Sequence, residues 1–434
     1  MTYDKLGSNR RAILKGAGSA AILTAARAVV PGGAWAATAD GPETATATLG
    51  FIALTDSSPL IIAKEKGLFA KFGMPDVKLA KQASWGTTRD NIELGGAHGG
   101  IDGAHILTPL PYLMAAGKVT KSGKLPMSML ARLNTNGQAI SVAKYYQSMG
   151  VGLDSSKMKA AFVKLRQNGG DPKVAVTFPG GTHDLWMRYW LAAGGIDPDR
   201  DVSTIVVPPP QMVANMKVKT MEAFCVGEPW NAQLVNQGIG FTALTTGELW
   251  HDHPEKSFAM RGDWVEKNPK AARALTMAVI EAQRWCDNPQ NRKELCEIVA
   301  RREYFKVPEE DIIGRTSGSI DYGNGKKVDN FPYLMKFWKD FASYPFQSHE
   351  AWFLTEDMRW GFLPPDTDIG GLLKAVNRED IWRAAAKAVG VNEAEIPKST
   401  SRGVEKFFDG KTFDPANPKA YLASLKIKRI AVGG

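Results

Sequence analysis

Apolar and polar positions along the chain follow a repeating pattern of a short strand and then a helix. Residues 45–53 are rich in Thr and branched apolar side chains, as in a strand, and residues 60–66 continue as a helix. Two further apolar runs, at 77–80 and 101–105, predict strands, with a helix over 89–94 between them. This alternation indicates an α/β domain whose sheet is mostly parallel.

The same pattern begins again in the second quarter of the chain. Residues 173–178, 202–207 and 223–226 are predicted strands, and a Gly-rich or Pro-rich turn follows each of the first two. Asn268 is a candidate N-cap for a long helix that runs to about residue 286. From there to the end, the chain consists mainly of predicted helix and loop.

We therefore predict two α/β lobes with a cleft between them, which is the type II-like clamp of periplasmic solute-binding proteins. The first lobe is expected over 45–135 and the second over 136–245, and 246–434 returns to the first lobe and adds a helical C-terminal region. Ligands of open α/β sheets bind beyond the carboxyl ends of the strands. The loops with candidate ligand contacts are those at 55–59, 84–88, 105–108, 179–183, 208–211 and 226–230.

The first 36 residues have the features of an export signal. The segment 8–15 contains the Arg10-Arg11 pair and resembles a twin-arginine signature. An Ala-rich apolar stretch follows over 16–30, and 34–36 offers a small-residue cleavage site. A frayed amphipathic helix is the alternative. Because no later run of 18 apolar residues exists, we expect an exported, periplasmic protein that is not inserted in the membrane.

Composition supports a globular protein, with 44% apolar and 23% charged residues. The net charge is +9, but the first 36 residues hold five basic side chains and one acidic, so the remaining chain carries +5. Its basic residues are interspersed with acids, which argues against nucleic-acid binding. The three cysteines, Cys225, Cys286 and Cys296, have no metal-ligand spacing. A bridge between Cys286 and Cys296 and free buried thiols both remain open.

Three polar or aromatic positions in the predicted loops are candidate ligand contacts. Trp85 offers an indole N–H beside Gly86, although a core Trp is the alternative. Gln138 lies where the first lobe passes into the second, as a hinge-side contact or a solvated turn residue. His183 begins a helix after a Gly-Gly turn, where unpaired backbone N–H groups favour an anion, unless its ring faces solvent.

Motifs of metal or covalent chemistry are weak in this sequence. The segment 251–256 holds two His and two acids, but Pro254 breaks helical spacing, so an ordinary loop is favoured over a metal site. The Gly-rich segment 95–100 lacks the Lys of a phosphate loop. We expect no metal and no cofactor. An enzyme on the same fold stays as an alternative, with Cys225 as the nearest reactive group.

Several of these segments together resemble the nitrate-binding proteins of ABC transporters, which are close relatives of bicarbonate-binding proteins. The resemblance covers nearly all of the chain after residue 45 and is carried by Ser84–Gly86, Gln138, Phe178–His183, Cys225–Asn231 and His253–Lys256. It implies a clamp that delivers nitrate or nitrite to an inner-membrane permease. The ligand contacts that it implies are Trp85, Gln138, His183, Lys256 and the Val226–Gly227 backbone. Some family members are lipoproteins, whereas this chain has no lipid-attachment cysteine.

The implied contacts suit the chemistry of nitrate. Nitrate has three oxygens and no proton, so a site made of donors alone would satisfy it. Bicarbonate carries one O–H, which needs an acceptor, and the resemblance implies that bicarbonate-binding relatives have Glu at the position of Lys256 and use calcium. Lys256 therefore favours nitrate. A bicarbonate-binding protein and a nitrate sensor for a regulatory partner are the alternatives.

Overall fold

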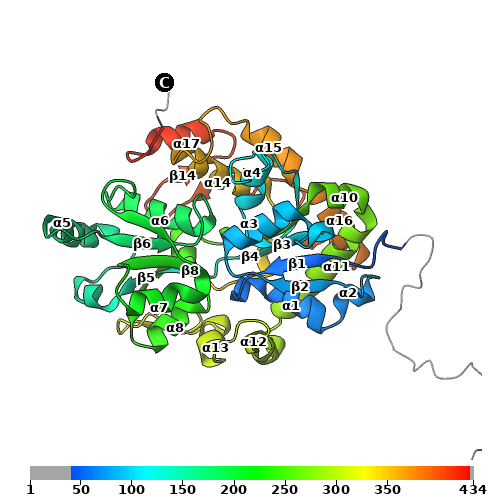
Figure 1. Ribbon diagram of the computed structural model, residues 1–434, viewed down its shortest axis with the longest axis horizontal. Helices are drawn as coiled ribbons and strands as arrows, with labels where there is room; N and C mark the ends of the chain where they lie inside the picture. The colour runs from blue at the N-terminus through cyan, green and yellow to red at the C-terminus, as the bar shows by residue number, and fades with distance from the viewer. Residues whose placement is uncertain (1–40, 431–434) are drawn as a thin grey trace, which may run out of the picture.

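The computed structural model describes residues 41–430, which form two α/β lobes lying side by side (Figure 1). The first lobe has a five-stranded sheet in the order β2-β1-β3-β10-β4. Its strands are β1 (Thr48–Phe51), β2 (Lys78–Lys81), β3 (Gly103–Leu107), β4 (Met127–Thr135) and β10 (Pro254–Arg261). The predicted export signal at 1–36 lies outside the described residues.

The second lobe has a five-stranded sheet in the order β7-β6-β8-β5-β9. Its strands are β5 (Gln138–Ala143), β6 (Lys173–Val176), β7 (Ser203–Val206), β8 (Ala223–Gly227) and β9 (Gly240–Thr245). The predicted two-lobed fold is confirmed. Each sheet, however, combines two parallel with two antiparallel pairings and is mixed rather than mostly parallel. The antiparallel pairings come from β4, β5, β9 and β10, all four of which lie outside the predicted strands.

Helices cover both sheets. The first lobe has α1 (Ser58–Glu65), α2 (Leu68–Lys71), α3 (Trp85–Leu94) and α4 (Leu110–Ala115), after a 3₁₀ turn, η1 (Thr55–Ser57). The second lobe has α5 (Lys159–Gln167), α6 (Thr182–Ala193), α7 (Met212–Lys217) and α8 (Trp230–Asn236). The remaining helices are α9 (Thr246–Leu249), α10 (Gly262–Lys267), α11 (Pro269–Cys286), α12 (Arg292–Ala300), α13 (Glu310–Ser317), α14 (Gln347–Arg359), α15 (Ile369–Val376), α16 (Glu379–Ala388) and α17 (Pro418–Ser424).

Three local predictions differ from the structure. Trp85 is the first residue of α3 and not a loop residue, because the Ser84 side chain caps the helix by accepting from the Thr87 N–H. The segment 251–256 was predicted as an ordinary loop, but its last three residues belong to β10, which begins at Pro254. The Asn268 side chain does not cap α11 and instead donates to the Trp264 carbonyl.

The chain crosses between the lobes at residues 136–137 and again at 246–253. The first crossing joins β4 to β5 in two residues, Asn136 and Gly137, both with positive φ. A Cβ on Gly137 would lie 2.2 Å from the Met335 side chain, so only glycine fits this tight link. The shortness of the link fixes Gln138, the first residue of β5, at the boundary between the lobes.

The C-terminal third packs on both lobes and not on the first lobe alone. Helix α11 packs against α1 and α16, and α15 and α16 pack against β4, all in the first lobe. Helices α14 and α13 reach the second lobe, where they contact α6 and α8 (Figure 1). On α14, the Trp352 ring stacks on the Trp186 ring of α6, with their centroids 5.0 Å apart. This aromatic packing keeps water away from one side of the cleft between the lobes.

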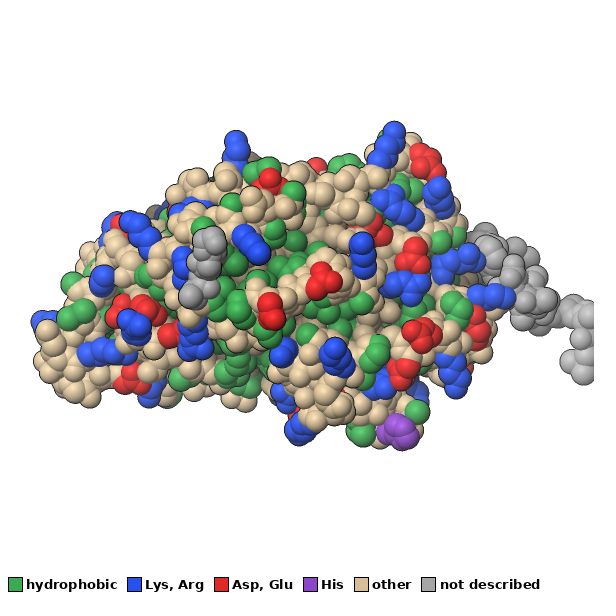
Figure 2. Space-filling view, turned by 90° about the horizontal axis from the view of Figure 1, so that it is seen from above, with side chains coloured by type: hydrophobic (Ala, Val, Ile, Leu, Met, Phe, Trp, Pro, Cys, Tyr) green, Lys and Arg blue, Asp and Glu red, His purple; other side chains and the backbone are tan. Residues whose placement is uncertain are grey.

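Charged groups are dispersed over the visible surface. On the face in Figure 2, Lys and Arg side chains lie among Asp and Glu side chains without a block of one sign. None of the helices within residues 41–430 is both long enough and apolar enough to cross a bilayer. The three cysteines are buried, and each is a free thiol.

An ion pair between Arg132 of β4 and Glu350 of α14 joins the first sheet to the C-terminal region. Both side chains are fully buried. Burial raises the pKa of Glu350 to about 7 even with Arg132 beside it. Two nitrogens of Arg132 and one oxygen of Glu350 have no hydrogen-bond partner, so each charge depends on the other.

Removing one charge of this pair should destabilise the protein more than removing both. We expect Glu350→Leu to lower the free energy of unfolding by about 3–5 kcal/mol, because it leaves a buried guanidinium unpaired. Adding Arg132→Met to Glu350→Leu should recover most of the lost free energy of unfolding. Chemical denaturation followed by Trp fluorescence measures both variants, and equal losses in the single and double variants would contradict this account.

Candidate functional site

The predicted contact residues come from both lobes and meet at the boundary between them. Trp85 of α3 and Lys256 of β10 belong to the first lobe, whereas Gln138 of β5, His183 of α6 and Gly227 of β8 belong to the second. All five are buried. A clamp requires contact residues from both lobes, and these five residues meet that requirement.

The distances show which of the five residues touch one another. His183 Nε2 lies 2.8 Å from Gln138 Oε1 and 3.4 Å from Lys256 Nζ. Lys256 Nζ lies 5.8 Å from the centre of the Trp85 ring. Gly227 pairs with Gln138 in the sheet, and a Cβ on Gly227 would lie 2.6 Å from Gln138 Oε1. A side chain at position 227 would therefore project into the cluster.

Val226 takes part differently from the other predicted residues. It pairs with Ala139 in the sheet, and its carbonyl accepts from Asn231 Nδ2 at 2.8 Å. That carbonyl is therefore directed at α8. The part of the Val226–Gly227 segment that lies beside Gln138 is Gly227.

Lys256 is held by two carboxylates, neither of which was predicted as a site residue. Its Nζ lies 3.0 Å from Asp56 Oδ2 and 2.8 Å from Glu255 Oε1, and all three side chains are fully buried. Burial disfavours the charged ammonium, but Asp56 and Glu255 outweigh burial and raise the pKa of Lys256. The expectation that the site contains donors alone is therefore wrong.

A distortion of β10 allows Glu255 and Lys256 to contact each other. Adjacent side chains of a regular strand point to opposite faces. The pairing of β10 with β4 shifts register on both sides of Lys256, between Pro254 and Lys256 and again between Lys256 and Ser257. This bulge brings the two neighbouring side chains to the same cleft.

Asp56 accepts hydrogen bonds from both lobes. It lies in η1, at the carboxyl end of β1, and accepts from His105 Nε2 at 2.5 Å and from Gln138 Nε2 at 2.9 Å. Burial would raise the pKa of Asp56, but Lys256, His105 and Gln138 together lower it well below its usual value. Asp56 is therefore ionised. Residues 55–59 and 105–108 were among the predicted ligand loops, which was the available signal for Asp56 and His105.

Glu255 is the second carboxylate on Lys256, and like Asp56 it is fully buried. It accepts from the Thr182 hydroxyl and from Trp186 Nε1, at 3.0 Å for the indole. Both donors belong to α6, so Glu255 also joins the two lobes. Burial raises the pKa of Glu255 above its usual value, although Lys256 opposes the shift.

A chain of hydrogen bonds fixes the orientation of Gln138 and the protonation of His183. Because the Asp56 carboxylate only accepts, Gln138 must direct its NH₂ group to Asp56 and its carbonyl to His183. His183 Nε2 then carries the proton, and Nδ1 accepts from the Thr177 hydroxyl at 2.5 Å. Burial and Lys256 lower the pKa of His183 well below its usual value, so its ring is neutral.

Buried polar atoms without partners indicate where a ligand would bind. Trp85 is fully buried, and its Nε1 has no hydrogen-bond partner. Nearby, His105 Nδ1 and the Thr55 hydroxyl also lack partners. Native proteins leave few buried donors unpaired, so an unpaired indole N–H beside an ammonium points to an absent acceptor.

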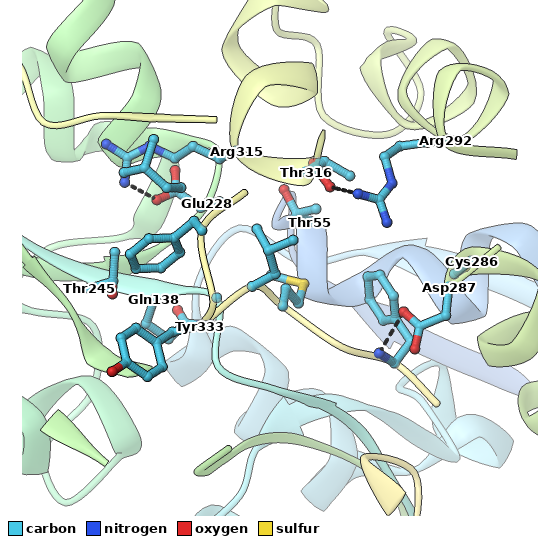
Figure 3. A pocket seen from close by; sticks show the side chains of 16 residues that line it. Thr55, Gln138, Glu228, Thr245, Cys286, Asp287, Arg292, Arg315, Thr316 and Tyr333 are labelled. Atoms are coloured by element: carbon cyan, nitrogen blue, oxygen red, sulfur yellow. Dashed lines mark hydrogen bonds and ion pairs between the residues drawn. The ribbon is translucent and has the colours of Figure 1, made fainter. Parts of the chain in front are cut away.

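A separate pocket lies on the hinge side of the cluster (Figure 3). It is lined by Gln138 and Thr55 and by outer residues that include Arg292, Arg315 and Tyr333. Arg315 is already paired with Glu228, at 2.7 Å. Among the predicted contact residues, only Gln138 lines this pocket, whereas Trp85, His183 and Lys256 do not.

The described residues give little support to metal or covalent chemistry. Within residues 41–430, no group of three His, Cys, Asp or Glu side chains is arranged to hold a metal ion. His253 Nε2 forms a hydrogen bond with the Thr246 hydroxyl, at 2.8 Å. Burial raises the pKa of Cys225 well above its usual value, which disfavours the reactive thiolate.

Comparisons with known proteins show the family to which this chain is similar. The model of the NMT1-like family matches residues 40–300. The nitrate/nitrite binding protein NrtA of Synechocystis sp. is 62% identical over 392 residues, which cover 90% of this chain and 87% of that protein. The bicarbonate-binding protein CmpA of Synechococcus elongatus is 43% identical over 403 residues, which cover 91% of this chain and 89% of that protein. The crystal structure of the periplasmic nitrate-binding protein NrtA from Synechocystis PCC 6803 has a TM-score of 0.87, covering 89% of this chain and 100% of that chain.

The protonation of His183 can be tested directly. We expect a neutral ring with the proton on Nε2 from about pH 5 to pH 8, because burial and Lys256 hold its pKa low and Gln138 needs a donor. Nitrogen-15 NMR of labelled histidines distinguishes the two tautomers and the charged ring. The exposed His98 serves as an internal comparison. A charged His183 ring at pH 7 would contradict the hydrogen-bond chain.

Proposed function

The chain belongs to the NMT1-like family and, within it, to the nitrate/nitrite-binding proteins, and on that premise we propose that it binds nitrate between its lobes. It is a solute-binding component of an ABC transporter and not an enzyme. Nitrite is the second ligand of the proposal, since the 62% identical relative is named for both anions. The contact residues proposed are Trp85, Gln138, His183, Gly227 with the adjoining Val226 backbone, and Lys256.

The unpaired indole N–H of Trp85 is the observation that carries this proposal. A count of the donors around it supports a ligand with three acceptor oxygens. The ammonium of Lys256 has three N–H groups, and Asp56 and Glu255 take two. The Gln138 amide has two N–H groups, and Asp56 takes one. One N–H from each of Trp85, Gln138 and Lys256 is thus available, which matches the three oxygens of nitrate.

His183 supports the anion site through Gln138. Its N–H already donates to the Gln138 carbonyl, which holds the amide with its NH₂ group toward Asp56 and the cleft. A direct contact between His183 and the anion requires that this bond be exchanged. Gly227 leaves room on the same side, because a Cβ there would lie 3.2 Å from Asp56 Oδ2.

Bicarbonate is the alternative ligand, and Lys256 alone does not exclude it. Asp56 and Glu255 could each accept from the hydroxyl of bicarbonate, so the cleft is not closed to that ligand by chemistry. Sequence identity favours nitrate, at 62% to the nitrate/nitrite binding protein against 43% to the bicarbonate-binding protein.

Transport and export complete the proposal. The anion would hold the lobes together across the cleft by contacting Trp85 and Lys256 on one side and Gln138 on the other. This closed form would dock on the inner-membrane permease and release nitrate when the lobes reopen. We propose that the chain works in the periplasm, where the 62% identical relative is described, and that Arg10-Arg11 directs its export by the twin-arginine route.

Calorimetric titration of the signal-free protein tests the ligand. We expect binding of nitrate, weaker or absent heat with bicarbonate with or without calcium, and about 10- to 150-fold weaker nitrate binding by Lys256→Gln. That range corresponds to about 1.5–3 kcal/mol for a hydrogen bond to a charged group. Lys256→Glu should nearly abolish binding, because it places a third carboxylate beside Asp56 and Glu255. The exposed Lys387→Glu is the matched charge control. Unchanged nitrate affinity in Lys256→Gln would remove this residue from the site.

Trp85→Phe tests the unpaired N–H. The indole N–H has no partner in the free protein, so its loss should leave the free energy of unfolding nearly unchanged. Nitrate affinity should fall about 2- to 12-fold, as for the loss of one hydrogen bond of about 0.5–1.5 kcal/mol. Trp190→Phe is the control, with the opposite expected result, because Trp190 Nε1 already donates to the Gly152 carbonyl. It should lose stability and keep its nitrate affinity.

A further inference from the structure

The charge balance in the cleft is unfavourable for an anion. Lys256 is the only Lys or Arg among the described residues that contact Asp56 or Glu255. All three side chains are fully buried, and with both carboxylates ionised they sum to a charge of −1. A bound nitrate would make the sum −2 in a site without exposure to water. Uncompensated charge in such a site is strongly disfavoured, so binding needs a compensating positive charge.

We propose that the cleft takes up one proton together with each bound anion, and that Glu255 holds this proton. The proposal rests on the proposed function, since it concerns the same cleft and nitrate as the anion. In this step, a proton from solvent bonds to a carboxylate oxygen of Glu255, and nothing is oxidised or reduced. The cluster then carries −1 with nitrate bound, the same charge as before binding.

Glu255 fits this role better than Asp56 because of its partners. Both carboxylates accept from three donors, but the donors of Asp56 are all N–H groups, on His105, Gln138 and Lys256. Glu255 accepts from the Thr182 hydroxyl, which can instead accept a hydrogen bond when the carboxyl is protonated. Protonation also weakens the hold of Glu255 on Lys256, whose ammonium can then turn to the anion.

The surroundings of Glu255 also favour the uncharged acid. Its indole donor, Trp186, packs against aromatic rings. The centroid of the Trp186 ring lies 4.5 Å from that of His253 and 5.0 Å from that of Trp352. Burial raises the pKa of Glu255, whereas Lys256 and His105 hold the pKa of Asp56 far below its usual value. Of the two carboxylates, Glu255 is therefore the one nearer to protonation at neutral pH.

Other titratable groups face this cluster from every neighbouring element, and none replaces Glu255 as the proton acceptor. They are His253 just before β10, Lys256 on β10, His183 on α6, Asp56 in η1, His105 on β3 and Cys225 on β8. Burial lowers the pKa of each of these three histidines, so all three stay neutral near pH 7. Burial raises the pKa of the Cys225 thiol, so it stays protonated.

The sign of the pH dependence follows from linkage. Nitrate would raise the pKa of Glu255 further, because a second negative charge disfavours ionisation. Affinity is then constant below the pKa of Glu255 in the free protein, where the acid is already protonated. Above that pKa it falls as pH rises, by up to about tenfold per pH unit, until the pKa of the bound state is passed.

Calorimetry in buffers of different ionisation enthalpy measures the proton directly. Nitrate is titrated into the signal-free protein in phosphate and in Tris, at several values from about pH 6 to pH 9. The difference in heat between the buffers gives the number of protons taken up. We expect this number to rise toward one per nitrate at the alkaline end, in step with the fall in affinity. Nitrate binding without proton uptake at every pH would overturn the proposal.

Two variants assign the proton to its residue. Glu255→Gln should bind nitrate with no proton uptake and a flat pH profile, and should bind more tightly than the unaltered protein at alkaline pH. Glu379→Gln is the matched control, because burial also raises the pKa of Glu379, and its carboxylate accepts from the Tyr344 hydroxyl in the C-terminal region, outside this cluster. It should keep the uptake. Proton uptake that persists in Glu255→Gln would overturn the assignment to Glu255. Absence of nitrate binding by the unaltered protein would instead contradict the proposed function.

Discussion

The ammonium of Lys256, held between Asp56 and Glu255 in a cleft closed to water, is the interaction on which the rest of the site depends. A buried ammonium needs ionised partners, and Asp56 supplies one from the first lobe. Through Asp56, the same charge orients Gln138 and His183 of the second lobe. Glu255 extends the contact to α6 by accepting from Thr182 and Trp186. One cation thus determines the hydrogen-bond directions on both sides of the cleft.

Three features of the fold place this cation. The bulge in β10 brings Glu255 and Lys256 to the same cleft, although they are neighbours in a strand. The two-residue link at 136–137 fixes Gln138 opposite Gly227, at the point where the lobes meet. The C-terminal helix α14 places Trp352 on Trp186, which keeps the surroundings of Glu255 dry. The long C-terminal region therefore has a part in the site and not only in closing the first lobe.

Much of this could be predicted from the sequence, and the rest could not for physical reasons. The two-lobed fold followed from strand–helix alternation, because such periodicity is local. The antiparallel strands were missed, since the pairing of β10 with β3 and β4 joins segments more than a hundred residues apart. Trp85, Gln138, His183, Gly227 and Lys256 meet in the structure. Asp56 and Glu255 were not predicted as site residues, because a carboxylate is not expected beside an anion until its ammonium partner is seen.

A crystal structure of the signal-free protein with nitrate tests the central claim most directly. The account predicts one nitrate in the cleft, with its oxygens within hydrogen-bonding distance of Trp85 Nε1, Gln138 Nε2 and Lys256 Nζ, while Asp56 remains bonded to His105. Nitrate bound elsewhere, such as in the hinge-side pocket near Arg292, with Trp85 Nε1 still unpaired, would contradict it.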